Sequence, residues 1–154
     1  MPTPIHQRVQ ACAEGRDPTL IARMASGWAV LGDPQVLRGY CLLLPDPVPP
    51  HLNALRPPAR TQFLTDMAAL GDAVLAVTGA VRINYAMFGN LAPALHAHVF
   101  PRYREEPEFA QTGHPWVYDW SKSANFDVKN DAALQQAICR HLQSQGLVLR
   151  TETN

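Results

Sequence analysis

The sequence lacks an excess of charge of either sign, since its 13 basic residues equal its 13 acidic ones. Proteins that bind duplex nucleic acid or an anionic membrane surface normally carry a positive excess, so both kinds of partner are disfavoured. No apolar run approaches the length of a bilayer span, and the first residues contain no continuous apolar stretch typical of a secretion signal. We therefore expect a cytoplasmic protein without a membrane segment.

Paired cysteines are also lacking. Cys12, Cys41 and Cys139 are far apart, odd in number and outside any CxxC spacing, which argues against a disulfide framework and a thiolate zinc site. Their apolar neighbours favour buried free thiols. Of the 154 residues, 47% are hydrophobic and 17% charged, which predicts a single folded domain over residues 1–154.

Helices are predicted in three places. The clearest spans residues 57–79, where apolar residues recur at intervals of three and four up to a terminating glycine. A short helix is predicted from Asp17, as the cap, to Gly27. A third is predicted from Asp131 to Gly146, with an apolar stripe through its middle.

Strands are predicted between these helices. Residues 28–31 and 36–44 surround the turn Gly32-Asp33-Pro34 and suggest an antiparallel hairpin. Alternation predicts further strands over residues 83–89 and 95–103, and a short last strand over 147–149. Trp116, Tyr118 and Trp120 alternate in the same way and, with Trp28, are candidates for a base pocket or a subunit contact, although aromatic stripes more often belong to a core or an interface.

The strand over residues 95–103 carries the most informative pattern. On a period of two, Leu95, Ala97 and Val99 share one face, while Ala94, His96, His98 and Phe100 share the other. The two imidazoles therefore project side by side. They are open to three interpretations: an ordinary polar pair, two ligands of a metal site, or a nucleophile with a neighbouring phosphate-binding ring. A metal site needs a third ligand, for which His114 is the nearest candidate.

The residues around this pair resemble a known family. The run from Gly89 to Arg102 contains a glycine followed by an amide, alternating histidines, and then two hydrophobic residues before Pro-Arg. It resembles the signature of the histidine triad (HIT) superfamily, and most closely the bacterial branch that is similar to diadenosine tetraphosphate hydrolases. The resemblance covers roughly residues 28–103, followed by an aromatic segment and helix over residues 104–154.

The resemblance implies roles for individual residues. His96 takes the position of the family's nucleophile, which forms a nucleotidyl-histidine intermediate, and His98 that of the histidine that contacts phosphate and assists the leaving group. Asn90 takes the position of an amide that touches phosphate oxygens, and backbone amides near Gly89 are expected to help. The expected activity is that of a nucleotide hydrolase or nucleotidyl transferase acting on a nucleoside phosphate ester, anhydride or phosphoramidate.

The sequence departs from the family at the first histidine of the triad, which is Ala94 here. In the family the backbone carbonyl at this position holds the nucleophile's second nitrogen, and alanine supplies it equally well. We expect Tyr40, on the facing hairpin, to fill the space left by the missing ring. Asp33 is a candidate for contacting the ribose, although an aspartate before proline is common turn chemistry. Arg102 is a candidate for countering a phosphate.

Together these observations predict an α+β domain with a mainly antiparallel sheet of about five strands, one long helix packed on it, and N- and C-terminal helices. The resemblance implies a homodimer and a small nucleotide substrate. No metal or other cofactor is required by a histidine nucleophile, although a divalent cation can accompany a polyphosphate substrate. The alternatives are a nucleotide-binding module that has lost turnover with its first histidine, and a metal-dependent hydrolase with His96 and His98 as ligands.

Overall fold

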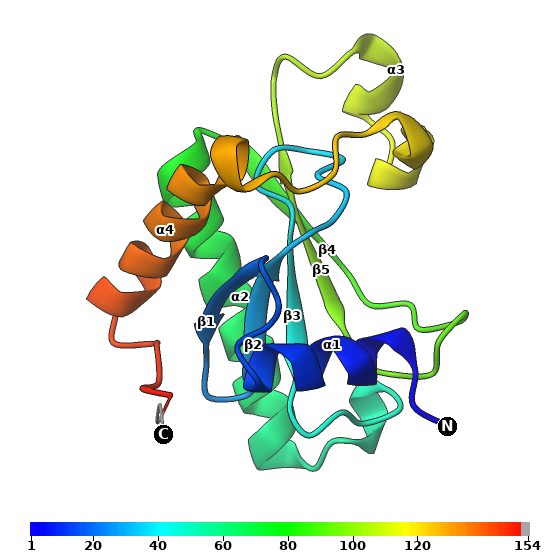
Figure 1. Cartoon of the computed structure of the whole chain (residues 1–154). Helices are drawn as coiled ribbons and strands as arrows, with labels where there is room; N and C mark the ends of the chain where they lie inside the picture. Colours follow the sequence, from blue (N-terminus) through cyan, green and yellow to red (C-terminus); the bar gives the residue numbers. More distant parts are fainter. Residues whose placement is uncertain (152–154) are drawn as a thin grey trace.

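The computed structural model describes residues 1–151 and contains a five-stranded antiparallel sheet (Figure 1). The strands lie in the order β1-β2-β3-β5-β4, so β1 and β4 form the two edges. Their bounds are β1 Leu20–Arg23, β2 Gly27–Leu31, β3 Cys41–Pro45, β4 Arg82–Ala86 and β5 Ala97–Arg102. The predicted α+β class and five-stranded sheet are therefore confirmed.

Helices cover both faces of the sheet. The long helices α2 and α4 lie together on one face, and α1 crosses the other (Figure 1). The α-helices are α1 Pro4–Ala13, α2 Pro57–Thr78, α3 Glu108–Gln111 and α4 Val128–Ser144, and the 3-10 helices are η1 Leu52–Ala54, η2 Pro115–Val117 and η3 Trp120–Lys122. Within residues 1–151, no helix is both long and apolar enough to cross a membrane.

The alternation of side chains along the strands creates a separate core on each face. One core lies beneath α2 and α4, where β5 contributes Ala97 and Val99. The other lies beneath α1, where β5 contributes Phe100. Helix α2 has the predicted extent because its apolar stripe is buried against the sheet, and Gly79 ends it in the left-handed conformation with φ 72°. These two cores fix the orientation of β5, which carries the histidines.

The predicted helix over residues 17–27 is wrong. The Asp17 carboxylate accepts hydrogen bonds from the backbone N–H and the hydroxyl of Thr19, as a helix cap would. The chain then enters β1 instead of a helix. Pairing with β2 overrides the local helical pattern here. The N-terminal helix lies earlier, in α1, where Thr3 and His6 form a capping box and Pro4 occupies the first turn.

Four other predicted elements differ in detail. Residues 116–120 run from η2 into η3 rather than forming an alternating strand. Residues 147–149 do not become a strand, although the Leu147 N–H donates to the Leu142 carbonyl and the Leu149 N–H to the Arg23 carbonyl. Helix α4 begins at Val128 with Asp127 as its cap, three residues before the predicted start at Asp131. Asp131 lies one turn inside the helix and accepts a hydrogen bond from the Asp127 N–H. The predicted hairpin is confirmed, but a longer connection replaces its tight turn, since β3 begins only at Cys41.

Candidate active site

His96 and His98 lie on the same face of the sheet, at the start of β5. Ala97 and Val99 belong to the core beneath α2, whereas Phe100 belongs to the core beneath α1, so the predicted division of the strand faces is confirmed. The two imidazole rings are 4.9 Å apart between centroids and meet edge to face. Both side chains are half-buried, which leaves each ring partly open to a ligand.

The orientation of the His96 ring is set by a backbone carbonyl. Its Nδ1 lies 2.8 Å from the carbonyl oxygen of Ala94. A carbonyl oxygen can only accept a hydrogen bond, so Nδ1 carries the hydrogen and Nε2 of the neutral ring keeps its lone pair. This is the protonation pattern that a histidine nucleophile needs, and the alanine at position 94 supplies it through its backbone.

The orientation of the His98 ring is set by a tyrosine. The hydroxyl of Tyr40 lies 2.6 Å from Nδ1 of His98. Burial of Tyr40 raises the pKa of its hydroxyl well above its usual value, so the hydroxyl keeps its hydrogen, and among the described residues Nδ1 of His98 is the acceptor within its reach. Burial, reinforced by the neighbouring His96, lowers the pKa of His98 to about 4. His98 is therefore neutral at pH 7, with Nδ1 as acceptor and Nε2 carrying the hydrogen.

Tyr40 does not fill the space beside Ala94, so that part of the sequence interpretation is wrong. The β3–β5 register, in which Cys41 is opposite Val99, places Tyr40 next to Phe100, and Ala94 precedes the other end of β5. The Tyr40 ring stacks on Phe100 with centroids 4.4 Å apart and planes inclined by 10°. Its side chain therefore acts on His98 rather than on the nucleophile.

A glycine allows Tyr40 to reach this position. A Cβ at Gly32 would lie 2.0 Å from Cδ1 of Tyr40, which is impossible without moving the ring. The ring cannot move freely because it is only 2% exposed and stacked on Phe100. Gly32 is thus required by the close approach of a buried aromatic ring to the backbone.

Replacing Gly32 with alanine is expected to displace Tyr40 from His98 and to lower the free energy of unfolding by about 1–3 kcal/mol, the usual cost of overpacking a core. Urea unfolding measures the change. In a Tyr40→Ala background the clash is gone, so the same Gly32→Ala substitution should cost little. An equal cost in both backgrounds would contradict the proposed contact.

Two cavities meet at His96. The larger, of about 420 Å³, is mainly apolar; its walls include Ile5 from α1, Trp116 and Trp120, and both histidines open onto it. The smaller, of about 270 Å³, lies on the other side of His96 and includes His51 and Ala94 in its wall. The nucleophile candidate therefore has room for a ligand on both sides.

Of the other predicted site residues, the structure brings Gly89 and Asn90 to the site. Gly89 lines both cavities and has φ 71°, a conformation that favours glycine, and Asn90 lines the larger cavity. Asp33 lines neither cavity; its carboxylate accepts a hydrogen bond from the backbone N–H of Phe126, 2.9 Å away, and so ties the connection before β3 to the segment before α4.

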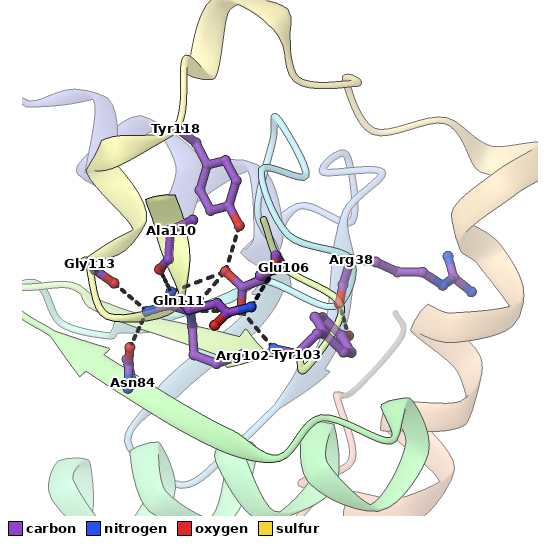
Figure 2. Close-up of polar contacts among 9 residues, drawn as sticks. All are labelled: Arg38, Asn84, Arg102, Tyr103, Glu106, Ala110, Gln111, Gly113 and Tyr118. Atoms are coloured by element: carbon purple, nitrogen blue, oxygen red, sulfur yellow. Dashed lines mark hydrogen bonds and ion pairs between the residues drawn. The ribbon is translucent and has the colours of Figure 1, made fainter. Parts of the chain in front are cut away.

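Arg102 has a structural environment that leaves no donor for a phosphate. Its guanidinium makes a bidentate ion pair with Glu106 and donates to the side-chain oxygen of Asn84 and the carbonyl oxygens of Ala110 and Gly113 (Figure 2). These acceptors engage all of its N–H groups. The residue is 7% exposed and lines neither of the cavities at His96. We therefore do not assign Arg102 to substrate binding.

The Arg102–Glu106 pair instead holds the segment that carries the tryptophans. Glu106 also accepts hydrogen bonds from the hydroxyl of Tyr118, at 2.6 Å, and from the Tyr103 N–H (Figure 2). Burial alone would raise the pKa of Glu106, but these hydrogen bonds and the guanidinium outweigh it and lower that pKa. The carboxylate thus stays charged and links β5 to the segment that positions Trp116.

Trp116 and Trp120 are the site residues that sequence reasoning placed least well. Their rings stack with centroids 5.3 Å apart, and Trp116 meets His98 edge to face at 5.2 Å. The sequence offered them as a base pocket or a subunit contact without linking them to the histidines. No sequence pattern marks Ile5 as a site residue; it lies in the first turn of α1, between Thr3 and His6 of the capping box.

The described residues 1–151 contain no cluster of three or more histidine, cysteine, aspartate or glutamate side chains arranged to hold a metal ion. His114 lies beside Trp116, with ring centroids 6.3 Å apart, and does not complete a ligand set with the two histidines. The candidate site is therefore a pair of oriented imidazoles beside two cavities.

Comparisons with solved structures place this arrangement in a known fold. A histidine triad protein from Marinobacter aquaeolei superposes with a TM-score of 0.72 and 19% identity over 90% of this chain and 95% of that one. One from Sinorhizobium meliloti gives 0.71 and 20% identity over 88% and 94%. The chain has the histidine triad fold.

A third structure with this fold, a hypothetical histidine triad nucleotide-binding protein from Sulfolobus tokodaii, gives a TM-score of 0.70 and 12% identity over 90% of this chain and 92% of that one. The chain matches no protein-family model and no curated protein sequence. At identities of 20% or less, the similarity shows the histidine triad fold alone. The chemistry follows from the geometry of the site.

Proposed function

We propose that this protein is a histidine triad enzyme, a nucleotide hydrolase or nucleotidyl transferase that works through a nucleotidyl-histidine intermediate on His96. The observation that supports this most directly is the hydrogen bond from His96 Nδ1 to the Ala94 carbonyl, which directs Nε2, the lone-pair nitrogen of the neutral tautomer, towards two cavities. The fold supports it too, since a solved structure with this fold is described as nucleotide-binding.

In the first step Nε2 of His96 attacks the phosphorus of a nucleoside phosphate, and the bond from phosphorus to the leaving group breaks. The positive charge that develops on the His96 ring is stabilised by its Nδ1–H donating to the Ala94 carbonyl. His98 donates from Nε2 to the phosphoryl group, and we assign Asn90 and the backbone amides near Gly89 to its remaining oxygens. In the second step water or another acceptor displaces His96.

The chemistry assigned to the site needs no resident metal ion, because a neutral imidazole nitrogen is itself the nucleophile. A divalent cation would enter as part of a polyphosphate substrate. We place the protein in the branch that resembles diadenosine tetraphosphate hydrolases, and propose that it is cytoplasmic and a homodimer. The edge strand β4 supports the homodimer, since Tyr85 within it and Val81 just before it are exposed apolar residues.

The test is to incubate the chelator-treated protein with labelled diadenosine tetraphosphate and to measure both binding and mononucleotide products. The proposal predicts turnover without added metal, or with magnesium added only as a partner of the substrate. Binding without any product would overturn it in favour of a nucleotide-binding module, for which the alanine at position 94 is the favouring observation. Turnover that is lost on chelation and restored only by a transition metal would favour a metal-dependent hydrolase.

A further inference from the structure

The contact between Tyr40 and His98 has a consequence for the leaving group. It rests on the proposed function, because it concerns how the bond from phosphorus to the leaving group breaks. We propose that Tyr40 is a positioning residue that holds His98 as a hydrogen-bond donor rather than an acid, and thereby restricts the enzyme to leaving groups that depart as anions.

The hydrogen bond between Tyr40 and His98 has a defined direction. Tyr40 is 2% exposed, and its hydroxyl lies 2.6 Å from His98 Nδ1. Among the described residues no other acceptor binds this hydroxyl. If Nδ1 carried a hydrogen, it would donate to the hydroxyl oxygen, and the buried O–H of Tyr40 would be left without an acceptor, which costs about 1–3 kcal/mol. Tyr40 therefore donates, and the hydrogen of His98 lies on Nε2.

The surroundings of His98 keep it neutral. The aromatic rings that face it are those of Tyr40, Phe100, His96 and Trp116, and none of them is an anion. Arg8 acts on Tyr40 and favours its ionisation, but burial outweighs it and the pKa of the hydroxyl stays raised. The pKa of His98 is lowered to about 4, so a doubly protonated ring is scarce at pH 7.

A neutral His98 that already has its hydrogen on Nε2 is a poor acid. Giving that hydrogen to the leaving group would produce an imidazolate unless Tyr40 passed its own proton to Nδ1, and a buried tyrosinate would then result. His98 can instead stabilise negative charge on the phosphoryl oxygens through an Nε2–H hydrogen bond. The leaving group must accept the electron pair of its bond to phosphorus without a proton from the protein.

The balanced reaction follows from this restriction. Nε2 of His96 forms a bond to phosphorus while the P–O bond to a phosphate or nucleotide breaks, and that group leaves as an anion with the electron pair. Water then attacks phosphorus, and the electron pair of the P–N bond returns to Nε2 of His96. One hydrogen of the water stays on the product phosphate and the other is released to solvent. Phosphoric anhydrides fit this scheme, whereas phosphoramidates do not, because an amine leaves only after it is protonated.

The test compares diadenosine tetraphosphate with adenosine 5′-phosphoramidate, which have the same nucleotidyl group and different leaving groups. At pH 7 we expect kcat/KM to favour the anhydride by about 100-fold or more, since general acid catalysis contributes roughly 10²–10⁴-fold where it operates. Turnover of the phosphoramidate should rise about tenfold for each unit by which the pH falls towards 6, because the substrate itself must be protonated. Equal turnover of both substrates at pH 7 would overturn the proposal.

Tyr40→Phe is the variant that separates positioning from packing, because it keeps the ring that stacks on Phe100 and removes only the hydroxyl. We expect kcat for the anhydride to fall about tenfold or more with little change in KM, and the anhydride-to-amidate preference to shrink. A Tyr85→Phe variant, which removes a hydroxyl that lies against Gly71 of α2 on the opposite face of the sheet, is the matched control and should keep the substrate preference. An unchanged preference in Tyr40→Phe would contradict the proposal.

Nitrogen-15 NMR of the histidine side chains reports on the Tyr40–His98 hydrogen bond in the absence of substrate. The wild-type protein should show His98 with hydrogen on Nε2 at pH 7, and Tyr40→Phe should lose that preference. Hydrogen on Nδ1, or a doubly protonated ring, would overturn the positioning role even in an active enzyme. Failure to turn over either substrate would instead overturn the proposed function, and the leaving-group restriction with it, while the spectra still report on the Tyr40–His98 bond.

Discussion

Replacing His96 with alanine is expected to lower turnover of a dinucleoside polyphosphate by about 10⁴-fold or more, because the nucleophile itself is removed. The remaining groups, His98, Asn90 and the backbone amides, can still bind phosphate, so binding should weaken far less than turnover. The measurement is steady-state kinetics beside equilibrium binding of the same substrate. This separation of turnover from binding distinguishes a nucleophile from a residue that only shapes the pocket.

The control for this experiment is His141→Ala. His141 lies in α4, on the opposite face of the sheet from the site, so its loss should leave kcat and KM unchanged. Because His96 is half-buried, its replacement should not prevent folding, and the thermal unfolding of the variant tests this directly. Retention of more than a tenth of the wild-type kcat in a folded His96→Ala protein would rule out the covalent mechanism.

Replacing Glu106 with alanine is expected to produce the largest loss of stability, about 3–5 kcal/mol in the free energy of unfolding. Its partner Arg102 is 7% exposed and would remain as a buried charge without its carboxylate. The segment that carries Trp116 and Trp120 would also lose its link to β5. Urea unfolding followed by tryptophan fluorescence measures both effects, since the two indoles should become more exposed to solvent.

Two variants make this prediction specific. Glu106→Gln keeps an oxygen to accept hydrogen bonds and should lose less stability than Glu106→Ala, so a folded variant remains even if the alanine protein does not fold. Glu14→Ala removes the partner of Arg16 in an exposed ion pair and should leave the urea midpoint unchanged, because such pairs contribute little. Equal losses for Glu106→Ala and Glu14→Ala would show that the buried cluster does not hold this segment in place.

Sequence patterns predict the parts of this fold that depend on local periodicity. Helix α2 and the faces of β5 follow from the spacing of apolar residues, because burial against one sheet requires that spacing. The sequence predicts a helix where β1 lies, because a short apolar run fits the helical and the strand pattern equally well. Pairing with β2 decides in favour of the strand. Helix α1 carries few buried residues, Val9 and Cys12, and its pattern is correspondingly weak.

The candidate site likewise contains contacts that local sequence predicts and contacts that depend on the fold. The His96–Ala94 bond is local, joining two residues just before β5, and the family resemblance implies it. The Tyr40–His98 bond joins residues 58 positions apart, and its partner depends on the β3–β5 register rather than on any motif. Arg102, at the end of the motif, and Asp33, at the hairpin turn, are substrate-binding candidates in the sequence, whereas in the structure backbone groups of other segments are their partners.

The most direct test of the central claim is mass spectrometry of the protein quenched in acid or alkali during turnover of diadenosine tetraphosphate. The account predicts a nucleotidyl adduct that is stable to base, labile to acid, and located on His96. The adduct should be absent from His96→Ala and present in His141→Ala. A turning-over protein that never carries an adduct, or carries it on another residue, would contradict the claim that the Ala94 carbonyl prepares His96 as the nucleophile.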